Sequence, residues 1–229
     1  MRLDRVLSNL NYGSRTDIKE ACKNKRVKVN GNIIVDPSRQ VFPKDEILFD
    51  DELVFHKEAF LLMLNKPSGV VSANKDNLHK TVIDLIKDPY NRYDLNICGR
   101  LDIDTVGLVL ITNSGKLMHK IISPNNNIDK TYYVEYSGSM SKSALESPLE
   151  LLDGNNETYT TKGSKVEILT SNSCNITISE GKFHQVKRMF ESIGCKVTYL
   201  KRIRIGNITL DESLKEGEYK EIEIDSLIC

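Results

Sequence analysis

The sequence predicts an α+β protein in which a small, basic α/β domain precedes a larger domain, built on a mostly antiparallel mixed sheet with flanking helices. Two observations indicate this class. Helix-spaced apolar residues and then a hairpin pattern fill about the first fifty residues. After residue 58, β-rich segments predominate and do not alternate regularly with helices. The polar, acidic stretch over residues 50–57 is the expected linker, which places the domains at residues 1–56 and 60–229.

The first domain is expected to contain two helices followed by a hairpin. Ser14, with Asp17 three residues later, is a capping signal for the second helix. Asn30-Gly31 lies between β-rich residues and is a strong hairpin-turn signal. The expected elements are helices over residues 2–11 and 15–24, a hairpin over residues 26–35, and short strands at Val41 and residues 47–49.

In the second domain, apolar runs of four to eight residues predict strands, and apolar residues at helical spacing predict helices. Glycine and proline mark several of the expected ends. The expected strands cover residues 60–64, 70–73, 107–112, 130–136, 165–169, 174–179, 196–205 and 208–210, and the expected helices cover residues 81–87, 116–122, 141–152 and 186–193.

The net charge of the chain is zero, but the charge is unevenly distributed. Lys and Arg number 32 against 32 acidic residues. Residues 1–28 nevertheless hold eight basic residues against three acidic ones, and residues 179–204 hold seven against two. These regions could follow an RNA phosphate backbone or could be ordinary solvated faces, and charge alone leaves both interpretations open.

Several protein classes lack support in the sequence. No apolar run approaches the ~20 residues that span a bilayer, and the first residues contain an acid instead of the apolar core of a signal peptide, so we expect a cytoplasmic protein. The five cysteines are scattered and form no Cys-x-x-Cys pair, which favours reduced thiols over a metal site or disulfides. Phosphate-binding, dinucleotide-binding and catalytic-triad motifs are absent.

Two aspartates stand out as candidates for chemistry. Asp102 and Asp104 are two residues apart, so an extended backbone would point both carboxylates the same way. They could divide acid and nucleophile roles. Asp104 could instead bind backbone donors in a turn, which turn chemistry favours, and Asp102 could be a plain loop carboxylate. Spacing alone leaves catalysis undecided.

A second cluster surrounds the start of the helix expected at residues 186–193. Lys187 and Arg188 follow a glycine-containing loop, and His184, Gln185 and free backbone N–H groups could bind a phosphate there. They could equally be exposed residues of an amphipathic helix. The adjacent pair Tyr132-Tyr133 is similarly open, because one ring should pack in the core and the other could stack on a base.

Taken together, these segments resemble the pseudouridine synthases that modify single sites in bacterial ribosomal RNA, and the resemblance covers nearly the whole chain. Its most specific part is Gly-Arg-Leu-Asp-Ile-Asp-Thr-Val-Gly at residues 99–107. The first domain resembles the RNA-binding domain first seen in ribosomal small-subunit protein four. The segments that carry the resemblance are residues 2–5, 13–15 and 26–31 in the first domain and residues 63–69, 99–113, 123–124, 130–132, 178–189 and 205–206 in the second.

The resemblance implies roles for individual residues. Asp102 matches the family's catalytic aspartate, and Tyr132 matches the tyrosine that stacks on the target uracil. Lys187 falls at the basic position that pairs with the aspartate; many synthases have Arg there, so either Lys187 or Arg188 could be the partner. Ile178 matches an aliphatic residue that packs against the base. The expected substrate-binding set is Arg100, Thr105, Ile178, His184, Gln185 and Arg188, and the expected RNA-binding set is Arg2, Ser14, Arg15, Lys19, Lys23 and Arg26.

The chemistry implied by the resemblance needs neither a metal nor a cofactor. It requires a carboxylate nucleophile, a cation that keeps it ionised and a dry pocket for the detached base. The chain ends soon after an acidic segment at residues 221–225, without the basic tail often found in relatives that act on large-subunit RNA, so 16S ribosomal RNA is the expected partner of a monomeric enzyme. The alternatives are a synthase for 23S ribosomal RNA and a non-catalytic ribosomal-RNA-binding assembly factor.

Overall fold

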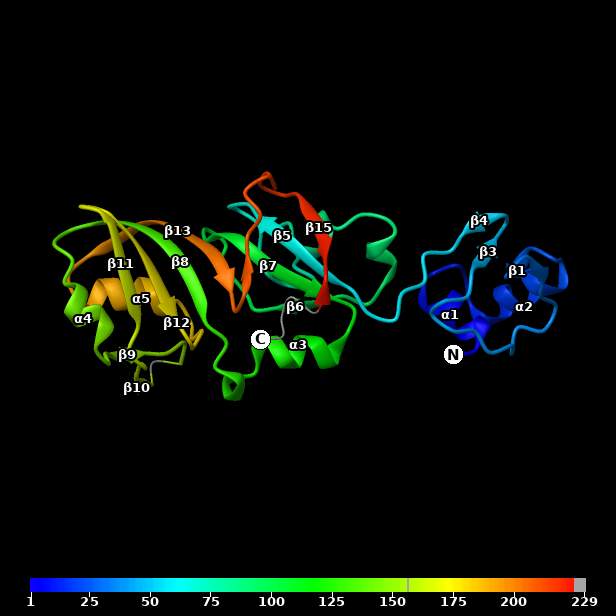
Figure 1. Cartoon of the computed structure of the whole chain (residues 1–229), viewed down its shortest axis with the longest axis horizontal. Coiled ribbons are helices and arrows are strands. Elements are labelled where there is room, and N and C mark those ends of the chain that lie inside the picture. Colours follow the sequence, from blue (N-terminus) through cyan, green and yellow to red (C-terminus); the bar gives the residue numbers. More distant parts are fainter. Residues whose placement is uncertain (156, 225–229) are drawn as a thin grey trace. The chain divides into compact units, whose positions relative to one another are not determined.

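A computed structural model describes residues 1–155 and 157–224 of the chain. They form two compact units (Figure 1). The first unit holds Met1–Ala59 together with Ile86–Asp94, and the second holds Phe60–Leu85 and the chain from Leu95 onward. Within the described part of the chain, no helix is long and apolar enough to cross a membrane.

The first unit consists of two helices packed on a small antiparallel sheet. Its elements are α1 (Leu3–Asn9), α2 (Arg15–Lys23), β1 (Val27–Val29), β2 (Asn32–Ile33), β3 (Ile47–Phe49), β4 (Glu52–Leu53) and the 3₁₀ turn η2 (Tyr90–Arg92). The strand order is β2-β1-β3-β4. Ser14 and Asp17 form the expected capping box at α2. Asn30 and Gly31 both have positive φ, as the tight turn between β1 and β2 requires, so the expected hairpin is confirmed.

The second unit is built on a nine-stranded mixed sheet. Its strands are β5 (Leu61–Lys66), β6 (Asn96–Cys98), β7 (Val106–Thr112), β8 (Lys130–Ser137), β11 (Lys165–Thr170), β12 (Ser173–Ile178), β13 (Lys196–Ile205), β14 (Ile208–Thr209) and β15 (Tyr219–Ile222). The main path runs β11-β12-β8-β13-β7-β5-β15, with β6 paired to β7 and β14 paired to β13. The pairing of β13 with β7 is parallel, and the other pairings described for this sheet are antiparallel. The predicted α+β class is therefore confirmed.

Short helices and a second small sheet complete this unit. They are η1 (Ile83–Leu85), α3 (Gly115–Ile122), η3 (Pro124–Asn126), α4 (Lys142–Glu146), α5 (Gln185–Ser192), β9 (Glu150–Leu152) and β10 (Thr158–Thr160). Helix α5 packs on β13, and α3 packs on β6 and β7 (Figure 1). Strand β7 is buried along its whole length, and its residues Leu108 and Leu110 join the apolar cluster beneath α3. Burial of this kind is the main stabilising contribution to such a domain.

Some expected elements in the second unit are wrong. The helix expected at residues 141–152 ends at Glu146, because Pro148 excludes the preceding residue from helical geometry, and Ser147 is extended with ψ of 156°. The helix expected at residues 81–87 is only the 3₁₀ turn η1. No strand forms at residues 70–73, where only an isolated bridge joins Val71 to Thr81.

Other differences concern the first unit and the chain that joins it to the second. Val41 lies beside an isolated bridge at Gln40 instead of in a strand, and the expected linker contains β4. Residues 86–94, expected in the second domain, pack in the first unit. There the Phe55 ring contacts Tyr90 and Tyr93, with centroids 5.1 and 6.1 Å apart. Contacts between residues so distant in the chain leave no periodic signal, so the sequence could not predict them.

Candidate active site

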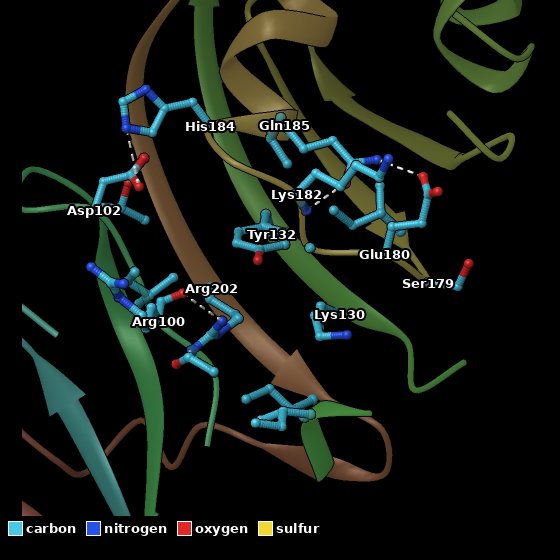
Figure 2. Close-up of a pocket in the computed structure, with 18 of the residues that line it drawn as sticks. Arg100, Asp102, Lys130, Tyr132, Ser179, Glu180, Lys182, His184, Gln185 and Arg202 are labelled. Carbon is cyan, nitrogen blue, oxygen red and sulfur yellow. Dashed lines mark hydrogen bonds and ion pairs between the residues drawn. The ribbon is translucent and has the colours of Figure 1, made fainter. Parts of the chain in front are cut away.

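A pocket of about 360 Å³ opens in the second unit (Figure 2). Its floor is formed by one face of the sheet, with Lys130 and Tyr132 of β8, Ile178 of β12, and Leu200, Arg202 and Ile205 of β13. One wall is the loop between β6 and β7, residues 99–105, and another is the loop between β12 and α5, residues 179–184. Both loops were among the segments with the expected site residues.

Asp102 lies in the first of these loops and lines the pocket. A turn sets its position, because the Thr105 backbone N–H donates to the Asp102 carbonyl oxygen at 3.2 Å. Its side chain is 27% exposed, so the carboxylate is accessible from the pocket without being fully solvated. In Figure 2 Asp102 lies on one side of Tyr132, and Glu180 and Lys182 lie on the other.

The Lys187 ammonium lies between two carboxylates. Its Nζ is 3.0 Å from Asp102 Oδ2 and 2.6 Å from Asp104 Oδ1. Burial opposes the charge on Lys187, but hydrogen bonds to Asp104 and Asp102 outweigh it and raise the pKa of Lys187. Burial likewise opposes ionisation of Asp104, yet the ammonium lowers the pKa of Asp104 on balance. Asp104 is therefore a member of the ion-pair cluster, which goes beyond the turn role that its sequence position favoured.

Arg188 is not at the carboxylates. Its guanidinium donates to the carbonyl oxygen of Asp153 at 2.9 Å and also to that of Leu152. The two consecutive basic residues of α5 thus point to different surroundings, and it is Lys187 that reaches Asp102.

His184 contacts the other carboxylate oxygen of Asp102. Its Nε2 is 3.4 Å from Asp102 Oδ1. His184 has φ of +52°, which is uncommon for a residue with a side chain, and it immediately precedes the first turn of α5. Gln185 fixes the loop that precedes it: its amide nitrogen donates to Glu180 Oε2 at 2.8 Å, and its amide oxygen accepts from the Lys182 backbone N–H at 3.1 Å.

The floor of the pocket combines an aromatic ring with aliphatic side chains. Tyr132 is 7% exposed and lines the pocket, whereas Tyr133 has its ring centroid 6.1 Å from that of Tyr199 and its hydroxyl donates to Glu135, so the roles of the two tyrosines are distinct. Ile178 is buried at the end of β12 and lines the pocket near Tyr132. Tyr132 and Ile178 therefore give part of the floor an apolar surface that suits a planar ligand, and Lys130 and Arg202 line the pocket from the same strands as Tyr132 and Leu200.

Two buried cations that were not among the expected site residues hold the loop that carries Asp102. The Lys66 side chain has no exposed surface, and its ammonium donates to the carbonyl oxygens of Pro67, Ile103 and Thr105 at 3.0, 3.3 and 2.8 Å. Burial lowers the pKa of Lys66 to about 8. These carbonyls satisfy the buried ammonium, which would be costly to leave unpaired.

Arg202 supports the other end of the same loop. It is 1% exposed and donates to the carbonyl oxygens of Leu108 and Gly99 at 2.8 and 2.9 Å. The sequence did not indicate that Arg202 is buried. The segment that forms β13 alternates basic and apolar residues, which is typical of a half-exposed strand. For Lys66 a signal existed: it ends a buried strand inside the polar segment at residues 65–69.

The remaining expected substrate-binding residues differ in exposure. Arg100 lines the pocket and is exposed. Thr105 also lines it but is 1% exposed, and its hydroxyl has no hydrogen-bond partner among the described residues. Within the same described ranges, no group of three His, Cys, Asp or Glu side chains could hold a metal ion.

The expected RNA-binding residues all lie in the first unit. Arg15, Lys19 and Lys23 are exposed on α2. Arg2 pairs with Asp4 at 2.7 Å and Arg26 pairs with Asp50 at 2.5 Å, so part of their charge is neutralised. The Ser14 hydroxyl caps α2.

Comparison with known proteins finds a matching family for each of the two units. Residues 60–192 match a family described as RNA pseudouridylate synthase, and residues 1–47 match the S4 domain. Ribosomal small subunit pseudouridine synthase A of Haemophilus influenzae is 41% identical and covers 100% of both chains. The protein of the same name from Escherichia coli (strain K12) is 37% identical, again over 100% of both. An uncharacterized RNA pseudouridine synthase of Bacillus subtilis, YtzG, is 40% identical over 99% of this chain and 97% of its own length.

Solved structures agree with these sequence matches. A crystal structure of a pseudouridylate synthase has a TM-score of 0.69 and 40% identity, and the match covers 100% of each chain. A chain of a Cbf5-Nop10-Gar1 complex covers 69% of this chain with a TM-score of 0.51 at 16% identity, which shows a shared fold.

Proposed function

The chain belongs to the RNA pseudouridylate synthase family and is an RNA pseudouridine synthase with an S4 domain; from that premise we propose that it isomerises a specific uridine of 16S ribosomal RNA, with Asp102 as nucleophile and no cofactor. The observation that carries the assignment of residues is the ion pair between Asp102 and Lys187 at the edge of a pocket floored by Tyr132.

The choice of 16S ribosomal RNA rests on the relatives. Two of them, at 41% and 37% identity over their full lengths, are named for the ribosomal small subunit. The S4 domain supplies a separate basic surface, in which we assign RNA contacts to Arg15, Lys19 and Lys23. We further propose that the enzyme acts as a monomer in the cytoplasm, where bacterial ribosomal RNA is modified.

The reaction is an isomerisation, and its balance is met without a co-reactant. The bond between uracil N1 and ribose C1′ breaks, the base turns, and a bond forms between C5 and C1′. The proton on C5 is lost, and N1 gains one. No oxidant, reductant or phosphate donor is consumed, so a nucleophile and a binding site for the detached base are sufficient.

The residues of the pocket fit these requirements. The Lys187 ammonium donates to the Asp102 carboxylate at 3.0 Å and so holds in place the group that we propose as nucleophile. The target uridine has to leave its stack to reach this depth, and Tyr132 offers a ring to receive it, with Ile178 beside it. Lys66 and Arg202 act on the position of Asp102 by holding its loop, and we assign them positioning roles.

Carbodiimide mapping of pseudouridine tests the proposal. The purified enzyme is incubated with unmodified 16S and 23S transcripts, and the same mapping is applied to ribosomal RNA from a deletion strain. We expect one site in 16S RNA that is formed by the enzyme and lost in the strain. A 23S site would overturn the 16S assignment, and no site in either RNA would indicate a non-catalytic assembly factor.

Replacement of Asp102 tests its role as the nucleophile. Asp102→Asn keeps the size of the side chain but removes the charge and nucleophilicity, so pseudouridine formation should fall below detection while RNA affinity stays within about threefold. Tritium release from C5-labelled RNA measures the first quantity, and filter binding measures the second. Retained activity in this variant would disprove the role of Asp102.

A further inference from the structure

Phe183 stands apart from the other residues of the loop between β12 and α5. The residues on both sides of it line the catalytic pocket, and Phe183 does not. Its side chain is 51% exposed, although aromatic rings contribute most when they are buried. The loop therefore places a large, half-exposed ring next to the pocket, outside its lining.

The ring is held in place by its neighbours. It stacks on the His184 imidazole, with centroids 3.7 Å apart and an angle of 19° between the planes. The Arg188 guanidinium carbon is 5.1 Å from the ring centroid. His184 in turn contacts Asp102, so the ring is linked to the nucleophile through one intervening side chain. A ring fixed in this way loses little further freedom when a ligand stacks on it.

The reaction creates a need for such a ring. When a uridine is flipped into the pocket, the bases next to it lose a stacking partner, which costs free energy. Exposed aromatic rings beside basic side chains are the usual means by which proteins stack unpaired bases. Arg188 lies 5.1 Å from the ring centroid, and the exposed Lys182 precedes Phe183 in the chain with its ammonium 3.8 Å from the Tyr159 ring centroid, so positive charge for the phosphates of the same strand lies close to this loop.

We propose that Phe183 is a stacking platform for the RNA base directly next to the flipped uridine. The inference rests on the proposed function, since it needs a flipped uridine in the pocket. It adds a second base-binding site outside the pocket, with a single-stranded purine or pyrimidine as its ligand.

The test combines a variant of the ring with a change in the base. Phe183→Leu retains an apolar side chain but no aromatic face, and Phe183→Tyr retains the face. The substrate is the ribosomal RNA in which the target was mapped, assembled by splint ligation so that the nucleotide on either side of the target uridine is normal or abasic. Tyr199→Leu, which removes another partly exposed ring of the same unit (36% exposed) outside the pocket lining, is the matched control.

On normal RNA, Phe183→Leu should raise KM and Kd about tenfold, with kcat changed less than threefold. Phe183→Tyr and Tyr199→Leu should match the original enzyme, and circular dichroism should show that all variants are folded. On RNA that is abasic on the stacked side, the original enzyme and Phe183→Leu should bind equally, because the partner of the ring is gone.

The other outcomes overturn either the role of Phe183 alone or the proposed function as well. A loss in Phe183→Leu that persists on both abasic RNAs would mean that the ring acts on His184, and no loss on any RNA would mean that it has no role with RNA; either overturns this inference while the proposed function stands. An original enzyme that modifies neither ribosomal RNA would overturn the proposed function, and this inference with it.

Discussion

The ammonium of Lys187 is shared between Asp102 and Asp104, with the shorter contact to Asp104. Two acceptors on one cation have two consequences. They raise the pKa of Lys187, so the cation remains charged in mildly alkaline solution, and they fix its position beside the nucleophile. Asp104 therefore acts on Asp102 through Lys187, although its own side chain is 66% exposed and lies outside the pocket lining.

We predict that Asp104→Asn changes the pH dependence of kcat. Without the Asp104 carboxylate the pKa of Lys187 falls, so the ammonium loses its proton at lower pH and the alkaline limb of kcat should move to lower pH. The pair is half-exposed, so we expect a shift of roughly half a pH unit. Single-turnover rates between neutral and strongly alkaline pH provide the measurement.

Glu191→Gln is the control for this variant. It removes one exposed carboxylate from the same helix, α5, and leaves both contacts of Lys187 in place. Its alkaline limb should coincide with that of the original enzyme. If both variants shift equally, the cause is the overall charge of the region and not the contact with Lys187.

Among the elements, the pairing of β7 with β13 has the strictest steric requirement. Lys201 and Arg202 lie beside Val106 and Gly107 in this parallel pair. Gly107 has φ of +99°, and a Cβ on it would lie 2.3 Å from the Arg202 carbonyl oxygen. Only glycine permits this approach, which also brings the Arg202 guanidinium to the loop that carries Asp102.

Gly107→Ala should therefore destabilise the second unit by at least about 3 kcal/mol, because both the backbone conformation and the contact with a carbonyl oxygen are unfavourable. Thermal and urea unfolding would measure the loss. Gly115→Ala is the matched control: it stands at the start of α3, where a Cβ would meet nothing within 4 Å, and it should be neutral or slightly stabilising. Equal stability of the two variants would contradict the steric argument.

On the scale of the whole molecule, binding and chemistry are assigned to separate units of the chain. The S4 domain lies within the first unit, and the pocket is formed entirely by residues of the second. The exposed basic side chains of α2 can hold RNA by its phosphates whatever the sequence, while base contacts in the pocket select the uridine. Affinity and chemistry should thus be separable by mutation.

Replacing Arg15, Lys19 and Lys23 together by Ala should weaken RNA binding and reduce the slope of log Kd against log salt by about 2, because each of the three phosphate contacts contributes about 0.7 to the slope on single-stranded RNA. The rate at saturating RNA should stay within about threefold. Fluorescence anisotropy at several salt concentrations gives the slope. A triple variant of exposed lysines in the second unit, at Lys116, Lys165 and Lys196, removes the same charge and should leave the slope nearly unchanged. Equal slopes for the two triple variants would remove α2 from the interface.

Features that depend on residues close together in the chain could be predicted from the sequence. The capping box of Ser14 and Asp17 and the turn at residues 30–31 are formed by groups within a few positions of each other, so their signals are local and both predictions are confirmed. The motif at residues 99–107 likewise identified the family before the comparisons confirmed it.

Which charged side chains meet, by contrast, depends on how the chain folds. The choice of Lys187 over Arg188 as the partner of Asp102 joins residues 85 positions apart, and it depends on which side of α5 faces the β6–β7 loop. The burial of Lys66 and Arg202 depends in the same way on strands that are distant in sequence. A lysine or arginine in isolation favours water, and only a set of carbonyl oxygens assembled by the folded sheet can satisfy it inside the protein.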